Sequence, residues 1–248
     1  MTLRREIRRG DARRHRMVIW CVALAVLTAV GAAAASGASV RHAKTANSMT
    51  SLWIGDSYTA DHVATDTAAL LGWTRRLDGE GGTGFTANGH DVNPRFNTLP
   101  ARLSKDVAFD PSPRIVVIDA GRNDWRAAAD QFRQTVTLYF DALAADYPSS
   151  RIVVVAPYEM NPETSPDFTA MRALLGQQAQ AHGWAFVDPL AAHWINAYSA
   201  RLTISDGVHP NRKGAWYIAH HLAPAIASAL RVCRAASLGA HRVTRCQT

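Results

Sequence analysis

Cysteine is scarce in this sequence, with three among 248 residues. Cys21 lies in an apolar stretch, whereas Cys233 and Cys246 lie near the carboxyl end. No cysteine has a histidine at a spacing typical of metal ligands, so we expect neither a metal site nor a cysteine nucleophile. In an oxidising compartment Cys233 and Cys246 would be able to pair and close a small loop; two unpaired thiols are the alternative.

The central part of the chain lacks an excess of basic residues, although the net charge of the whole chain is +7. Residues 1–47 have nine Lys and Arg and two acidic residues, a charge of +7. Residues 48–230 have 14 basic and 18 acidic residues, a charge of −4, and residues 231–248 add four arginines and no acid. Because a nucleic-acid-binding domain carries its basic residues on its folded part, we predict no nucleic-acid partner.

Charge is absent from residues 17–35, which follow seven arginines in residues 1–16. A helix of this length spans about 28 Å, close to the thickness of a bilayer core. An arginine-rich flank stays in the cytoplasm, so the rest of the chain would lie outside. We interpret residues 17–35 as a transmembrane signal-anchor; a signal peptide cleaved among the small residues that follow is the alternative. The predicted localisation is the cell membrane with an extracytoplasmic domain, or secretion after cleavage.

The rest of the chain contains one predicted domain. A linker of small and polar residues occupies 36–49, the domain occupies 50–232, and a basic tail occupies 233–248. Apolar runs at 51–54, 73–78, 114–121, 151–157 and 184–188 indicate strands. Helical patterns cover 59–72, 124–148, 165–183 and 211–230, the last interrupted or kinked near Pro224. Strands that alternate with helices predict an α/β fold, a parallel sheet with helices on both faces.

Four polar segments follow expected strands or strand-like regions: Asp56–Ser57, Gly79–Gly84, Gly121–Asp124 and Ser205–Asn211. The carboxyl ends of parallel strands meet at one edge of a sheet, which is where such folds place their active sites. We therefore expect these four segments to converge on one rim.

A serine nucleophile needs a base, a residue that orients the base, and donors for the oxyanion. Ser57 is the candidate nucleophile, His209 the candidate base and Asp206, three residues earlier, its candidate partner. The order Ser, Asp, His occurs in α/β-hydrolases, but their G-x-S-x-G turn is absent from this position. The alternative interpretation makes Ser57 or Asp56 only the N-cap of the helix that follows.

Together the segments "GDS", "GEGGTGF", "GRND" and "DGVHPN" resemble the four sequence blocks of the SGNH, or GDSL-type, hydrolases, in the family's order. The resemblance implies a flavodoxin-like three-layer α/β/α sandwich with a parallel central sheet, and a serine-dependent ester hydrolase with no metal or other cofactor. It places the catalytic triad on Ser57, Asp206 and His209. The implied oxyanion donors are the Ser57 N–H, the Gly82 N–H and the Asn123 side chain, with Gly84 as the alternative glycine. Tyr58 departs from the pattern, because the family often has leucine at this position.

These observations predict an exported serine esterase or lipase that acts through an acyl-enzyme. Its partners would be a small-molecule, glycan or lipid ester and, through the amino-terminal segment, the membrane. An envelope O-acyltransferase that uses the same acyl-enzyme and a non-catalytic binding module on the same fold are the alternatives.

Overall fold

The computed structural model describes residues 49–239 and contains one parallel sheet of five strands. The strands are β1 (Thr50–Gly55), β2 (Thr74–Gly79), β3 (Ile115–Asp119), β4 (Arg151–Val155) and β5 (Ala185–Val187). Their order across the sheet is β2-β1-β3-β4-β5, and all four neighbouring pairs are parallel. This is the flavodoxin-like order, so the predicted fold class is confirmed.

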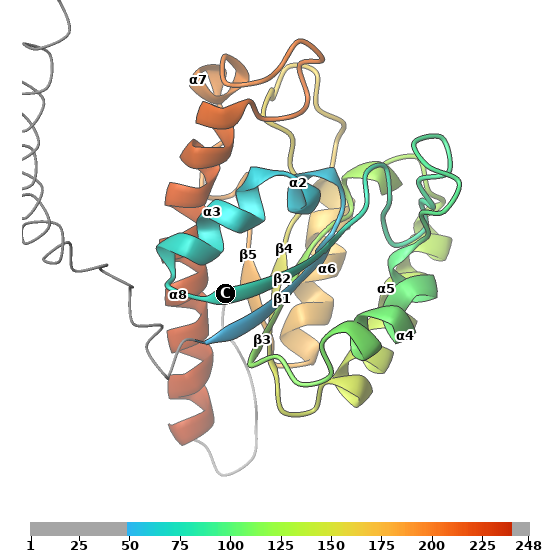
Figure 1. Cartoon of the computed structure of the whole chain (residues 1–248), viewed down its shortest axis with the longest axis vertical. Coiled ribbons are helices and arrows are strands. Elements are labelled where there is room, and N and C mark those ends of the chain that lie inside the picture. Colours follow the sequence, from blue (N-terminus) through green and yellow to red (C-terminus); the bar gives the residue numbers. More distant parts are fainter. Residues whose placement is uncertain (1–48, 240–248) are drawn as a thin grey trace, which may run out of the picture. The chain divides into compact units, whose positions relative to one another are not determined.

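Helices cover both faces of the sheet (Figure 1). The helices α3 (His62–Leu70) and α8 (Arg212–Gly239) pack on one face. The helices α4 (Leu99–Phe109), α5 (Ala129–Asp146) and α6 (Thr169–Ala181) pack on the other. Short helical turns complete the described chain: α2 (Ser57–Ala60), a 3-10 turn at Arg122–Asp124, and α7 (Ala197–Ala200).

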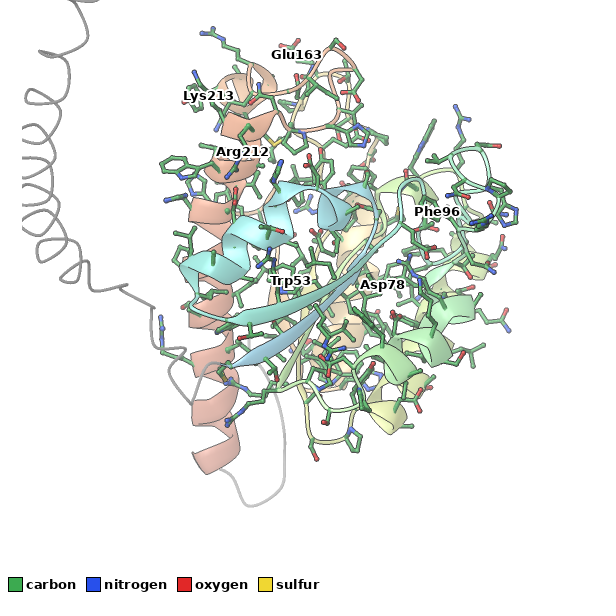
Figure 2. The ribbon with its side chains drawn as sticks, viewed as in Figure 1. Trp53, Asp78, Phe96, Glu163, Arg212 and Lys213 are labelled. Atoms are coloured by element: carbon green, nitrogen blue, oxygen red, sulfur yellow. The ribbon has the colours of Figure 1, made fainter. Side chains whose placement is uncertain are left out.

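The strands are apolar on both faces because each face meets a helical layer. Side chains alternate along β1, so Trp53 joins the core beside α3 and α8, while Leu52 and Ile54 join the core beside α4 and α5. Figure 2 shows Trp53 on the α8 side of the sheet and Asp78, in β2, on the α4 side. Two buried cores therefore fix the sheet between its helices.

The sheet register brings three of the polar segments to one edge. Gly55, the last residue of β1, is paired with Gly79 at the end of β2 and with Asp119 at the end of β3. The chain leaves all three strands at the same height, so the turns after β1, β2 and β3 are neighbours, as the sequence predicts.

Several predicted boundaries were wrong. The helix expected at 59–72 is two helices, α2 and α3, separated by Asp61 in an extended conformation. The helix expected from 124 begins at Ala129, because residues 122–124 form the 3-10 turn. Helix α8 continues through Pro224 and extends to Gly239, past the helix end expected at 230.

Helix α4 was not predicted. Its buried side includes Arg102 and Asp106 as well as Leu99 and Leu103, so the apolar periodicity that indicates a helix is weak. Thr98 caps its start by accepting a hydrogen bond from the Ala101 N–H, and Pro100 lies in the first turn, where a proline is tolerated.

The predicted signal-anchor at 17–35 and Cys246 lie outside the described residues, so the anchor and the pairing of Cys233 with Cys246 stay predictions. Among residues 49–239, no helix has the length and hydropathy that crossing a bilayer requires.

Candidate active site

The turn after β1 presents Ser57 at the carboxyl edge of the sheet. Ser57 is the first residue of α2, and Asp56 caps this helix by accepting a hydrogen bond from the Tyr58 N–H at 3.0 Å. A side chain on Gly55 would overlap the carbonyl oxygen of Asp119, so the sharp exit from β1 requires glycine. Asp56 therefore has the capping role that the alternative interpretation gave to this turn, while the Ser57 hydroxyl is left to face the segment that follows α7.

His209 links Ser57 to Asp206. Its Nε2 atom lies 2.8 Å from Ser57 Oγ, and its Nδ1 atom lies 2.6 Å from Asp206 Oδ2. The second carboxylate oxygen of Asp206 accepts hydrogen bonds from the N–H groups of Val208 and His209. Although partial burial opposes ionisation, these hydrogen bonds hold the pKa of Asp206 below its ordinary value. A carboxylate, an imidazole and a hydroxyl thus form one chain of hydrogen bonds.

The segment that carries Asp206 and His209 is a compact loop. Thr203 and Pro210 form a β-bridge, and the Ile204 N–H donates to the His209 carbonyl at 2.9 Å. Gly207 has a φ of 72°, which favours glycine at the turn between the two residues. The spacing of Asp206 and His209 is therefore set within the loop.

The glycine turn after β2 lies beside Ser57. A Cβ built on Gly81 would lie 3.8 Å from Ser57 Cβ. Gly82 has a φ of 74°, and within residues 49–239 its N–H has no hydrogen-bond acceptor. The Gly84 N–H, in contrast, donates to the Ala87 carbonyl at 2.8 Å. Between the two candidate glycines, only Gly82 has a free N–H.

Asn123 reaches the same turn from the other side. Its Nδ2 atom donates to the Thr83 carbonyl at 2.8 Å, which leaves the second hydrogen of the amide for another acceptor. The structure thus brings the Asn123 side chain next to the Gly82 turn, as expected for the four polar segments.

Asp124 is buried and clamps the segment after the glycine turn. Its carboxylate accepts hydrogen bonds from the N–H groups of Phe85, Thr86 and Ala87 and from the Thr86 hydroxyl. A side chain on Gly84 would collide with this carboxylate. The helix expected from 124 begins later, at Ala129, and Asp124 instead ties the segment after the glycine turn to the turn that carries Asn123.

Beneath the site, Arg122 is a buried cation between two buried carboxylates. It contacts both carboxylate oxygens of Asp56, at 2.9 and 3.0 Å, and also donates to Asp119. Its Nε–H donates to the Tyr158 carbonyl. Although burial opposes its charge, Asp119 and Asp56 raise the pKa of Arg122 further above its ordinary value. No sequence pattern indicated a role for Arg122, because its ion pair with Asp56 joins residues 66 positions apart.

A second charged cluster supports β1 from the α4 side. Arg102 donates to the Gly55 carbonyl at 2.6 Å and forms ion pairs with Asp78 and Glu80. Lys105 contacts the same two carboxylates. Burial, together with the hydrogen bond to Asp78, raises the pKa of Asp106 to about 8. The raised pKa favours the protonated form of Asp106 in the folded protein, in which two cations face two anions.

One exposed apolar side chain lies over the glycine turn. Val92 is 65% exposed, and its Cγ1 atom lies 3.6 Å from the position that a Cβ would take on Gly81. A turn that begins at Gly89 holds it there, with the Val92 N–H donating to the Gly89 carbonyl. Val92 lies against the glycine turn that is beside Ser57. It was not predicted, because a single valine in a loop carries no signal.

No cluster of metal-ligating side chains occurs among the described residues. The hydroxyl, imidazole and carboxylate described above, with N–H donors beside them, can carry out acid–base chemistry at this edge of the sheet.

Comparison with known proteins identifies the family. The sequence profile of the GDSL-like lipase/acylhydrolase family matches residues 53–217. A GDSL lipase of Mycobacterium tuberculosis, Rv0518, is 33% identical over 201 residues, which cover 71% of this chain and 81% of the relative.

Solved structures share the fold. An acetyl xylan esterase from Geobacillus stearothermophilus has a TM-score of 0.56 at 20% identity, covering 74% of this chain and 96% of its own. An α/β hydrolase from the metagenome of Lake Arreo, Spain, has the same TM-score and identity, covering 74% of this chain and 97% of its own. Taken with the profile match and the mycobacterial relative, these findings show that the chain belongs to the GDSL-like lipase/acylhydrolase, or SGNH hydrolase, family and is an esterase/lipase-type hydrolase.

Proposed function

We propose that the protein is an exported hydrolase of carboxylic esters in which Ser57, His209 and Asp206 form the catalytic triad. The observation that carries the proposal is the unbroken chain of hydrogen bonds from Asp206 through His209 to the Ser57 hydroxyl. In this arrangement His209 Nδ1–H donates to Asp206, so Nε2 is free to accept the Ser57 proton.

The reaction then has two halves. Ser57 Oγ attacks the ester carbonyl as its proton passes to His209 Nε2, and His209 returns that proton to the departing alcohol. Water repeats the sequence on the acyl-enzyme: it loses a proton to His209, and the carboxylic acid leaves as Ser57 recovers its hydrogen. Asp206 stabilises the imidazolium that forms in each half.

We assign oxyanion stabilisation to the N–H groups of Ser57 and Gly82 and to the Asn123 side chain. The free Gly82 N–H and the position of Asn123 beside Thr83 support this assignment, whereas the occupied Gly84 N–H argues against the alternative glycine. These donors bind negative charge that exists only in the transition state, so they should act on kcat more than on KM.

The test uses residues 48–248 of the purified protein with a fluorophosphonate probe and aryl esters graded from acetyl to palmitoyl. We expect the probe to label the wild type and not Ser57→Ala, and ester hydrolysis to disappear with the label. Labelling or full activity in a folded Ser57→Ala protein would show that Ser57 is only a turn residue. Within the ester series we expect a preference for the longer acyl chains, because the mycobacterial relative is named a lipase.

Export is the second part of the proposal and rests on the sequence of residues 1–35. In intact cells an external protease should digest the domain, and the domain should remain with the membrane if residues 17–35 anchor it. Protein in the medium that begins near residues 36–40 would instead show that residues 17–35 belong to a cleaved signal peptide. A domain that the protease reaches only in broken cells would contradict export.

A further inference from the structure

Tyr58 follows the candidate nucleophile, and it is hydrogen-bonded to Val208, which precedes the candidate base. Its side chain is fully buried, and its hydroxyl donates to the Val208 carbonyl at 2.6 Å. Ser57 and Tyr58 are consecutive in α2, and Val208 and His209 are consecutive in the loop between α7 and α8 (Figure 1). Two adjacent residues of one segment are therefore hydrogen-bonded to two adjacent residues of the other, in pairs 150 and 152 positions apart.

The ring and the hydroxyl of Tyr58 do different things. The ring packs against the Arg122 guanidinium at 4.1 Å, against Tyr158 edge-on at 5.4 Å, and beside His209 at 5.9 Å. Phenylalanine would keep all three ring contacts. The hydroxyl donates to the backbone of the loop, so replacing tyrosine with phenylalanine would remove one hydrogen bond and keep the packing around the ring.

The loop needs such a bond because little of it is buried. The side chains of Asp206 and His209 are 40% and 37% exposed, and the hydrogen bonds that fix their spacing lie within the loop itself. The loop therefore carries the pair as a preformed unit, but those bonds do not set the distance from His209 Nε2 to Ser57 Oγ. A single hydrogen bond to Ser57 would leave the unit able to pivot, whereas a second bond beside it fixes the orientation.

We propose that Tyr58 is a positioning residue whose hydroxyl holds the Asp206–His209 loop at hydrogen-bond distance from Ser57. The proposal rests on the proposed triad. A leucine at this position would have no hydrogen-bond donor, so the bond depends on the tyrosine hydroxyl. Misplacement of a reacting group by about 1 Å can lower a rate roughly 100-fold, and a partly retained geometry would lose less.

The test compares Tyr58→Phe with Tyr139→Phe. Tyr139 is also a buried tyrosine, and its hydroxyl has no hydrogen-bond partner among the described residues, so it controls for removing a buried hydroxyl. Tyr58→Leu is made alongside, so that the result does not depend on one variant folding. Thermal melting checks the fold, and active-site titration gives kcat per competent site.

For Tyr58→Phe we expect kcat and the rate of fluorophosphonate labelling to fall together, about 10- to 100-fold, with KM within about twofold. The midpoint of the acidic limb of the pH–rate profile should stay in place, because the bonds between Asp206 and His209 are untouched. A purely structural tyrosine would lower the melting temperature and leave kcat per titrated site unchanged. Tyr139→Phe should keep the wild-type kcat and labelling rate.

Two results would overturn the inference: a wild-type kcat and labelling rate in Tyr58→Phe, or a shifted acidic limb, which would mean that the hydroxyl acts on the Asp206–His209 pair itself. Failure of the proposed triad is distinguishable, because it appears in Ser57→Ala. If Ser57→Ala abolishes labelling and Tyr58→Phe changes nothing, the triad stands and only the positioning role is lost.

Discussion

Arg122 and Asp56 lie 66 residues apart in the sequence and form a buried ion pair directly beneath the nucleophile turn, with Nη1 2.9 Å from Oδ2. The pair ties the turn after β3 to the turn after β1. Asp119, the second buried carboxylate on Arg122, extends this connection into β3. The charges that flank the candidate nucleophile and the candidate oxyanion donor Asn123 therefore belong to one network.

Arg122→Met should destabilise the fold strongly. It removes the cation and leaves Asp56 and Asp119 buried without it, which typically costs about 3–5 kcal/mol of unfolding free energy. Urea denaturation at pH 7 measures the loss. The control is Arg126→Met, because Arg126 is exposed and should change stability by less than about 0.5 kcal/mol. Equal, small losses in both variants would contradict the role of the buried network.

Asn123→Ala should lower kcat by roughly 10²–10³, about 3–4 kcal/mol, with little change in KM. The reason is that the amide would donate to an oxygen that is negative only in the transition state. Steady-state kinetics on an aryl acetate separates the two constants. A rise in KM at constant kcat would mean that Asn123 binds the ground state of the substrate and is not an oxyanion donor.

Asp106 should make stability fall as the pH rises. Its pKa is raised from 3.8 to about 8 by burial and by the hydrogen bond to Asp78. Below about pH 4 the carboxyl is protonated in both the folded and the unfolded chain. Between about pH 4 and pH 8 only the folded chain keeps the proton, so raising the pH favours unfolding, and above pH 8 the effect is complete.

The measurement is the free energy of unfolding of wild type minus that of Asp106→Asn, from pH 4 to pH 9. Asparagine stays neutral and can still donate to Asp78, so this difference isolates the proton on Asp106. It should fall by a few kcal/mol over the range. A difference that is flat, or that rises with pH, would show that Asp106 is ionised in the folded protein.

Val92→Phe should change which esters the protein prefers. Val92 lies against the glycine turn beside Ser57. We expect the substrate to bind next to this turn, so a larger side chain should exclude bulky substrates more than small ones. We expect kcat/KM for the largest tolerated acyl or alcohol group to fall at least about tenfold relative to the acetyl ester. Leu138→Phe, at an exposed position on α5, is the control. Unchanged ratios in both ester series would exclude Val92 from the substrate site.

The sequence by itself determined the fold class and the residues worth testing. Buried β-branched strands that alternate with amphipathic helices predict a parallel sheet covered on both faces. The sheet pairs the backbone groups of the strands, and the connecting helices bury the apolar side chains on each face. Short local motifs singled out Ser57 and Asn123, which follow β1 and β3, and Asp206 and His209, which lie in the loop between α7 and α8. The first two meet because parallel strands bring their carboxyl ends to one edge.

Only the tertiary structure decided how those residues are held. The role of Asp124, the buried charge of Arg122 and the bond from Tyr58 to Val208 all join segments that are distant in the sequence. The proposal of Gly82 over Gly84 as an oxyanion donor rests on which N–H is already hydrogen-bonded. Helix α4 could not be predicted because buried charged residues interrupt its apolar pattern. Local patterns record propensity and periodicity, whereas these features depend on partners that folding alone brings within hydrogen-bond distance.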